Sequence, residues 1–516
     1  MRKHSAQIGL FCLYLLCGFA SEGGLRAEGE PGPASDPVGR AAAALAEDGS
    51  QPERWRSLVF SLMSRDDPGD RREAVEVARE AEERFPTSSE VVSIRARALV
   101  FLGEFEEGSA TARRAISLKE SNAEAHVALG EVYLAEWRLD DAQRELERAA
   151  ALSSTQPDAY FLLASLFARR KLYPLAADNL EIYNRIMKGD QTPFRGLGTS
   201  KEGKVGVWRA MGGRTPFAVD GDAVVTTVPM HRAKSGLHLI KVKPNGGKRE
   251  WFDIDSGSES LLISHSLMRK LGLKEISTTL VTGIGGKVVR SRTAILDSLT
   301  LGDFTIRNIP VEVMESFPKH KGKAVSGRIG QSFLREFIVT MNFPGKTFTL
   351  ELPRRQLQNQ PEGKGRGRPS LKHRIPMWYP SITMGTWEEA VTVPFLWDTG
   401  AGLSVLDARL FGSNLPLPAF QKKSRKGKDG TGEIIAYRKL AAFSRLRIDD
   451  LTFSIQPTVL DLRLINRRAP YLGGILGAEA MKDYQVTFDY FRGELRLQKV
   501  NLPSRKRNGP SGSVEN

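Results

Sequence analysis

The chain has 516 residues, of which 41% are hydrophobic and 26% are charged, as in an ordinary globular protein. This length exceeds what one hydrophobic core supports, so several domains are expected. The formal net charge of +15 is concentrated in three basic runs at residues 363–368, 422–428 and 504–507. Because no aromatic residues interrupt these runs, we interpret them as solvated segments and expect no nucleic-acid partner.

The N-terminus begins with MRKH and continues with an apolar stretch from Ile8 to about Ala20. A basic start, a short apolar segment and small residues before a cleavage point are typical of a secretory signal peptide, which we assign to residues 1–20. The stretch is short for a membrane span, so we expect none in the mature chain. The sequence therefore predicts export, to a periplasm or outside the cell. Lipidation at Cys17 stays open, although a bulky leucine precedes it.

The sequence contains two cysteines, Cys12 and Cys17, and both lie inside the expected signal peptide. Its removal would leave no thiol, which excludes cysteine catalysis, disulfides and a cysteine-based zinc site. The seven histidines show no spacing typical of metal ligands. We therefore expect neither a metal nor a cofactor.

Residues 51–187 are rich in Ala, Leu, Glu and Arg, and small side chains recur in them every 34 residues. Such series are Ala74, Gly108, Ala142 and Ala176, and also Ala96, Gly130 and Ala164. Small residues at this spacing let neighbouring helices pack closely, which indicates stacked helical hairpins. The best copy, residues 128–152, resembles the tetratricopeptide repeat. This resemblance implies a surface that binds a protein partner or substrate; the alternative is a helical bundle with accidental spacing.

After Lys188, short apolar runs alternate with Gly, Asn, Asp and Pro, as in an all-β region. Two stretches there, WFDIDSGSESLLIS at residues 251–264 and FLWDTGAGLSVL at residues 395–406, carry an aspartate at the end of an apolar run. A hydroxyl residue and a glycine follow each aspartate; the two sets are Asp255, Ser256 and Gly257, and Asp398, Thr399 and Gly400. An unpaired buried charge costs several kcal/mol, so each carboxylate requires a partner or a task.

The segments that follow the two aspartates contain the same series of sequence features. Each aspartate is followed by a glycine-rich hairpin signal, a pair of strands, and an apolar-glycine step with a short helix. The distance from Asp255 to Gly330 is 75 residues, and that from Asp398 to Gly477 is 79 residues. The pattern predicts a tandem duplication with lobes at residues 216–353 and 381–500, a basic linker at 354–380 and a basic disordered tail at 501–516.

This series of features resembles the retropepsin-like branch of the aspartic proteases. The resemblance implies two all-β barrel lobes that each donate one aspartate, so that Asp255 and Asp398 share one proton and activate water to hydrolyse a peptide bond. The hydroxyls of Ser256 and Thr399 would lock the two loops together, and Gly257 and Gly400 would permit close approach. The flap candidates are Gly283, Gly285, Gly286, Gly430 and Gly432. The expected ligand is a peptide or protein substrate.

Three residues of the first lobe depart from the family pattern. Arg328 stands where an apolar residue is usual before Gly330, Ser258 replaces the usual alanine, and Glu259 follows it. A buried arginine or an extra carboxylate could retune the aspartate pair or accompany a loss of function. Two alternatives to a single-chain endopeptidase therefore stay open. They are a catalytically degenerate peptide-binding or scaffold protein, and a protease assembled as a homodimer of like lobes.

Overall fold

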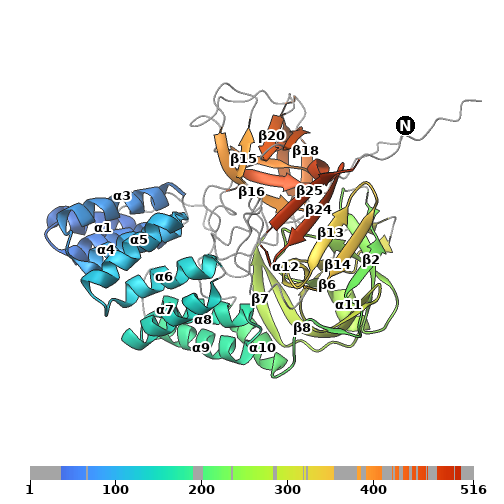
Figure 1. Cartoon of the computed structure of the whole chain (residues 1–516), viewed down its shortest axis with the longest axis horizontal. Coiled ribbons are helices and arrows are strands. Elements are labelled where there is room, and N and C mark those ends of the chain that lie inside the picture. The colour runs from blue at the N-terminus through green and yellow to red at the C-terminus, as the bar shows by residue number, and fades with distance from the viewer. Residues whose placement is uncertain are drawn as a thin grey trace, which may run out of the picture.

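The structure is a computed structural model of the whole chain. It describes residues 36–64, 68–136, 138–189, 201–233, 236–282, 288–315, 317, 319–320, 323–353, 381–384, 391–408, 421, 425–428, 434–440, 444–448, 451–460, 462, 473–492 and 494–500. The predicted signal peptide, linker, tail and flap glycines lie outside these ranges. A helical region is followed by two β-rich regions (Figure 1).

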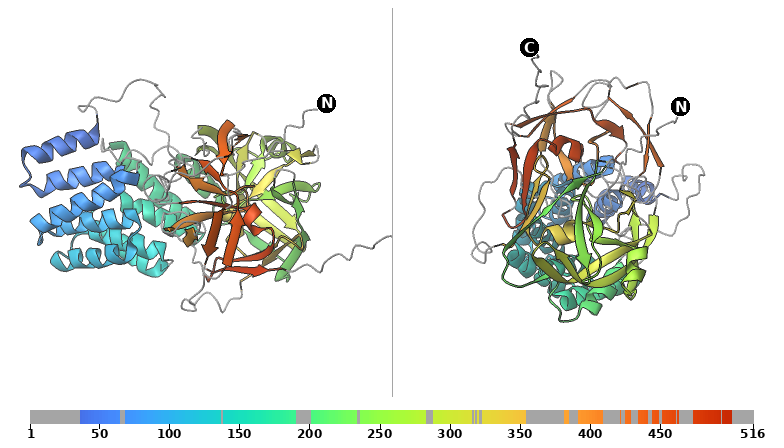
Figure 2. Two further views of the ribbon diagram at one scale, coloured as in Figure 1. Left: turned by 90° about the horizontal axis from the view of Figure 1, so that it is seen from above. Right: turned by 90° about the vertical axis from the view of Figure 1, so that its right-hand side faces the viewer.

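The helical region follows the 34-residue period of the sequence. Its first helices of each pair, α4 (Ser89–Leu102), α6 (Ala123–Ala135) and α8 (Pro157–Arg169), begin 34 residues apart. Their partners α5 (Phe105–Leu118), α7 (Leu139–Leu152) and α9 (Tyr173–Gly189) keep the same step. Before them come α1 (Pro37–Glu47), α2 (Pro52–Ser64) and α3 (Pro68–Arg84). The prediction of stacked helical hairpins is confirmed, and Figure 2 shows the stack from two further sides.

The small residues of the period stand where helices touch. A Cβ atom on Gly108 would lie 2.8 Å from Val100 Cγ2, and one on Gly130 would lie 2.7 Å from Leu146 Cδ2. Real Cβ atoms do not approach other atoms this closely. Small residues therefore recur with this period because the helices pack closely at these positions, and the facing side chain fills the space that a larger residue would need.

One helix was not expected from the sequence. The change of composition after Lys188 suggested β-structure, but α10 (Lys201–Met211) continues the helical region beyond the predicted end at residue 187. Trp208 of α10 stacks on Tyr173, with ring centroids 6.3 Å apart. Two glycines, Gly203 and Gly206, weaken the helical pattern of this segment, which is why its sequence does not stand out.

Helix α10 also packs against the first β-rich region, on strand β7 (Ser277–Thr282). The hydroxyl of Ser277 donates a hydrogen bond of 2.7 Å to the carbonyl of Gly203. A Cβ on Gly206 would lie 2.9 Å from Ser277 Cβ. The glycines thus let the helix axis approach the strand, and α10 joins the helical repeats to the β-structure (Figure 1).

The first β-rich region is built on one sheet of nine described strands. Along the sheet the order is β1 (Ala218–Asp220), β9 (Phe304–Met314), β6 (Leu262–Ser264), β12 (Gly327–Ile329), β5 (Glu250–Ile254), β4 (His238–Pro244), β8 (Val288–Leu301) and β7, with β3 (His231–Arg232) paired to β4. Because β8 also pairs with β9, the pairings from β9 through β5 to β8 form a closed circuit. Helix α11 (His265–Lys270) follows β6, helix α12 (Gln331–Leu334) follows β12, and β10 (Lys319–His320) pairs with β11 (Lys323–Ala324).

The second β-rich region repeats the central pairing of the first. Its described strands run in the order β18 (Arg425–Lys428), β19 (Ile434–Lys439), β22 (Thr458–Leu460), β17 (Val405–Asp407), β23 (Gly474–Gly477), β16 (Val391–Asp398), β15 (Ser381–Met384), β20 (Ser444–Ile448) and β21 (Leu451–Ile455). Strand β16 is parallel to β23, as β5 is to β12. On its other edge, β23 pairs with the antiparallel strand β17, as β12 pairs with the antiparallel strand β6. Helix α14 (Ala478–Met481) follows β23 as α12 follows β12.

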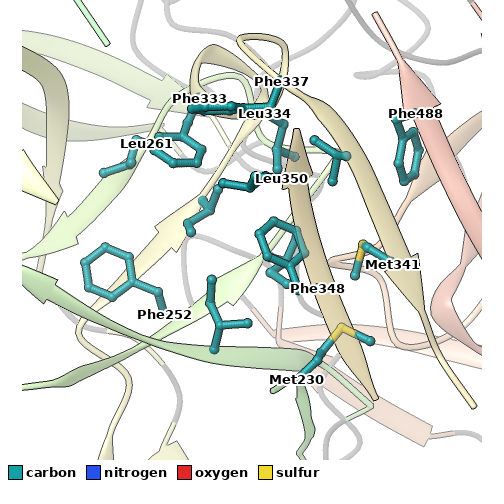
Figure 3. Packing of buried hydrophobic residues seen from close by; sticks show 14 of the residues in the cluster. Met230, Phe252, Leu261, Phe333, Leu334, Phe337, Met341, Phe348, Leu350 and Phe488 are labelled. Atoms are coloured by element: carbon teal, nitrogen blue, oxygen red, sulfur yellow. The ribbon is translucent and has the colours of Figure 1, made fainter. Parts of the chain in front are cut away.

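A third sheet joins the two regions. Its order is β2 (Val225–Pro229), β14 (Thr347–Glu351), β13 (Ile338–Asn342), β24 (Tyr484–Asp489) and β25 (Glu494–Lys499). The junction is the antiparallel pair β13–β24, in which Met341 lies opposite Val486. The side chains of Met341, Phe348 and Phe488 are buried in one apolar cluster that draws on both regions (Figure 3). This sheet fixes the two regions relative to each other.

None of the helices in the described ranges is long and apolar enough to cross a membrane.

The contact of α10 with β7 is testable at Gly206. Alanine would favour the helix by about 1 kcal/mol, but overpacking against a Cβ that cannot rotate away costs about 1–3 kcal/mol. We therefore expect Gly206→Ala to lower the free energy of unfolding, measured by urea denaturation. The control is Gly213→Ala, because a Cβ on Gly213 would meet nothing within 4 Å. If Gly206→Ala were as stable as the control variant, the close packing of α10 on β7 at Gly206 would be contradicted.

Candidate active site

The two aspartates of the duplicated motif lie at equivalent places. Asp255 follows the last residue of β5, and Asp398 ends β16. Both are fully buried, with 0% of each residue exposed. Within each loop the glycine amide donates to the carboxylate, from Gly257 to Asp255 Oδ1 at 2.9 Å and from Gly400 to Asp398 Oδ1 at 2.7 Å. Each loop therefore orients its carboxylate with its own backbone.

The structure brings these two carboxylates together within one chain. A Cβ on Gly257 would lie 2.5 Å from Asp398 Cγ, and a Cβ on Gly400 would lie 2.3 Å from Asp255 Cγ. The carboxyl group of each loop thus occupies the place that a side chain on the other loop's glycine would need. Glycine at both positions leaves the space that this approach needs.

The hydroxyl residues lock the loops by reciprocal hydrogen bonds. The amide of Ser256 donates to Thr399 Oγ1 at 2.9 Å, and the amide of Thr399 donates to Ser256 Oγ at 3.0 Å. Each hydroxyl then donates to a backbone carbonyl of the opposite strand, Ser256 to Trp397 at 2.8 Å and Thr399 to Ile254 at 3.1 Å. These four bonds are buried, and they link segments that are more than 140 residues apart in the chain.

The supporting residues around the loops also correspond. In the first region the amide of Leu261 donates to Ser332 Oγ at 3.0 Å. In the second, the amide of Ser404 donates to Glu479 Oε1 at 2.8 Å. The two acceptors each stand two residues after the glycine of the apolar-glycine step, Gly330 or Gly477. The correspondence between the two halves therefore extends to side chains outside the motif.

Arg328 is the main difference between the two halves of the site. Its side chain is buried, and it donates to both oxygens of Asp253, from Nε at 2.9 Å and from Nη2 at 2.8 Å. Its remaining nitrogen, Nη1, lies 3.0 Å from Asp255 Oδ2. Sequence analysis found Arg328 but missed Asp253. The signal that could have found Asp253 is its place two residues before Asp255, because side chains two residues apart in an extended segment point to the same face of the sheet.

Burial and like charge set the proton affinity of the site. Burial raises the pKa of Asp398 well above its usual range, and the neighbouring carboxyl group of Asp255 raises it further. Burial also raises the pKa of Asp253, although the Arg328 guanidinium acts in the opposite direction. A proton is therefore held in the site at a pH at which isolated aspartates have lost theirs.

The other departures from the family pattern lie beside the aspartate pair and do not join it. The amide of Ser258 donates to the carbonyl of Asp255 at 3.2 Å, and its hydroxyl donates to the carbonyl of Ser260 at 3.2 Å, so Ser258 stabilises the loop. Glu259 pairs with Lys204 of α10 at 3.4 Å. The loop that carries Asp255 is thereby tied to the helical region.

The flap candidates Gly283, Gly285, Gly286, Gly430 and Gly432 lie outside the described residues. The strands on either side of them do form antiparallel hairpins, β7 with β8 and β18 with β19. In the part of the chain that the structure describes, no cluster of three or more His, Cys, Asp or Glu side chains could hold a metal ion.

Residues 240–333 match the sequence model of the aspartyl protease family. The match includes the Asp255 loop and Arg328 but ends before Asp398. The first β-rich region thus carries an aspartyl protease family domain, and the stacked helical hairpins precede it. A search of curated proteins finds no match to this chain.

Several solved structures resemble parts of the chain. TTC0263, a thermophilic TPR protein of Thermus thermophilus, has 20% identity and a TM-score of 0.27, and the match covers 30% of this chain and 82% of that chain. MamA has 21% identity and a TM-score of 0.23, over 30% of this chain and 87% of that one. Conglutin gamma, a basic 7S globulin from lupine seeds, has 13% identity and a TM-score of 0.34, over 54% of this chain and 96% of that one.

The lock between the loops is testable at Thr399. Thr399→Val removes an acceptor and a donor, so the buried amide of Ser256 and carbonyl of Ile254 lose their partner at a cost of about 1–3 kcal/mol in unfolding free energy. Thr458 offers a matched control, because it is also fully buried and its hydroxyl has no hydrogen-bond partner among the described residues. We expect Thr458→Val to be nearly neutral. Equal losses in the two variants would contradict the lock.

Proposed function

We propose that this protein is an aspartic endopeptidase in which Asp255 and Asp398 together activate water for peptide-bond hydrolysis. The observation that carries the proposal is the pair of buried carboxylates, each packed against the glycine of the other loop and held there by the reciprocal bonds of Ser256 and Thr399. The family match of the segment around Asp255 supports it. The tandem β-rich regions would be two barrel lobes of one enzyme.

The chemistry follows from the shared proton. Two adjacent carboxylates cannot both ionise easily, so the pair holds one proton over a range of pH. The ionised member can take a proton from water, while the protonated member donates a hydrogen bond to the carbonyl of the scissile bond. Neither step needs a metal or a cofactor.

The surrounding parts have roles consistent with a peptidase. The hairpins β7–β8 and β18–β19 would cover a bound peptide, and the helical repeats would bind a protein partner or present a substrate. The N-terminal sequence pattern supports export before the enzyme acts. Because α10 contacts both β7 and the loop that carries Asp255, the helical region is positioned to influence how substrates enter.

A second candidate function is favoured by one contact. The Arg328 guanidinium lies 3.0 Å from Asp255 Oδ2, where it could occupy an oxygen that a peptidase would offer to water. The protein would then bind peptides without cleaving them. Binding of a statine-type peptide without cleavage of any peptide in a diverse library would favour this alternative.

The peptidase proposal is testable by single substitutions. Asp255→Asn and Asp398→Asn should each lower kcat/KM for library-derived peptides by at least about a hundredfold, because acid–base catalysis contributes about 10²–10⁴-fold. The exposed Asp297→Asn should leave cleavage unchanged, and so should a metal chelator. Because the pKa of Asp398 is raised, activity should fall as pH rises through that pKa and the pair loses its proton. It should also fall at low pH, where both members are protonated. Retained turnover in either Asn variant would remove that residue from the mechanism.

A further inference from the structure

The two halves of the site differ at one pair of facing residues. In the first half, Asp253 of β5 lies opposite Arg328 of β12. At the equivalent place in the second half, Leu396 of β16 lies opposite Ile475 of β23. The strand pairing is parallel in both, so the comparison is between the same two positions of a duplicated unit. An ion pair on one side thus stands where the other side has an apolar contact.

The geometry of this ion pair places one charged nitrogen of Arg328 beside the aspartate pair. The two bonds to Asp253 use Nε and Nη2, and this bidentate contact fixes the plane of the guanidinium. The third nitrogen, Nη1, is thereby placed 3.0 Å from Asp255 Oδ2, where it makes an ion-pair contact and not an aligned hydrogen bond. An arginine remains charged at any pH at which the protein is folded, so this positive charge beside Asp255 is permanent.

Among the described residues, three strands bring charged groups to the site. Asp253 and Asp255 lie on and just after β5, Arg328 lies on β12, and Asp398 ends β16. A positive charge in contact with Asp255 stabilises its ionised form, and the effect falls with distance. At the corresponding place in the second half, β23 carries the apolar Ile475, whereas Arg328 of the first half is in contact with Asp255. The surroundings of the two carboxylates are therefore unequal.

We propose that Arg328, oriented by Asp253, is a positioning residue that assigns the roles within the pair. It holds Asp255 as the ionised member, which takes the proton from water, and so leaves the shared proton on Asp398, which donates to the substrate carbonyl. This inference rests on the proposed peptidase function. Asp253 has a second role, because its negative charge offsets that of Arg328 and keeps the pair able to retain one proton.

The chain supplies its own control for this proposal. The double variant Asp253→Leu/Arg328→Ile installs the residues of the second half in the first. Replacing a buried ion pair with apolar residues is often neutral or stabilising, so the variant should fold. Without the guanidinium, ionised Asp255 loses its nearest counter-charge. The acid limb of the kcat/KM profile should therefore move up by about one pH unit, a tenfold change in proton affinity.

A second variant should move the same limb the other way. Asp253→Asn keeps Arg328 but removes the charge that offsets it, so the pair should lose its first proton at lower pH than in the wild type. The control Arg307→Met removes the exposed arginine paired with Asp220 in the same lobe and should leave the profile unchanged. An unchanged acid limb in both test variants, or shifts of the same sign, would overturn the proposal.

A readout that needs no turnover separates this inference from the peptidase proposal. Titration of protein labelled with ¹³C at the aspartate carboxyl carbon, assigned by the Asp255→Asn and Asp398→Asn variants, reports which carboxyl group ionises first. We expect Asp255 to ionise at lower pH than Asp398 in the wild type, and the difference to shrink in the double variant. Ionisation of Asp398 first, or an unchanged difference, would contradict the role of Arg328. A wild-type chain that cleaves no peptide yet titrates as expected would overturn only the peptidase proposal.

Discussion

The site depends on two side-chain hydroxyls that exchange hydrogen bonds across the junction of the β-rich regions. Ser256 and Thr399 each accept from the amide of the other and donate to a carbonyl of the opposite strand. Because all four bonds are buried, water does not compete for them in the folded protein, and the loss of either hydroxyl leaves buried backbone groups without a partner. The lock brings Asp255 and Asp398 close enough to share a proton, and the sheet across β13 and β24 holds the regions that carry them.

The duplication makes one half of the molecule a reference for the other. Both halves keep the parallel strand pair, the glycine that admits the opposite carboxylate, and a side-chain acceptor two residues after the second glycine. The buried Asp253–Arg328 pair is a difference between the two halves, and it lies next to the Asp255 carboxyl group. A buried ion pair is often no more stabilising than apolar residues in its place, so stability does not explain the Asp253–Arg328 pair. A role in setting the proton affinity of the site explains it better.

The sequence predicted those features that repeat. The 34-residue period located the helical hairpins because it records close helix contacts, and the two Asp-hydroxyl-Gly motifs located the loops because both carry the same local geometry. Helix α10 escaped prediction, since its glycines serve contact with β7 and weaken the helical pattern. Asp253 escaped because its partner, 75 residues later, is set by the register of β5 against β12, and a single sequence does not contain that register.

Assembly of the site within a single chain is the central claim, and a mixing experiment tests it most directly. Equal amounts of the Asp255→Asn and Asp398→Asn proteins are combined and assayed for peptide cleavage, beside a dilution series of the wild type. The account predicts no recovery on mixing and a specific activity that is independent of dilution, because linked regions face each other at a high effective concentration. Activity restored by mixing, or lost from the wild type on dilution, would show that the site is formed between chains.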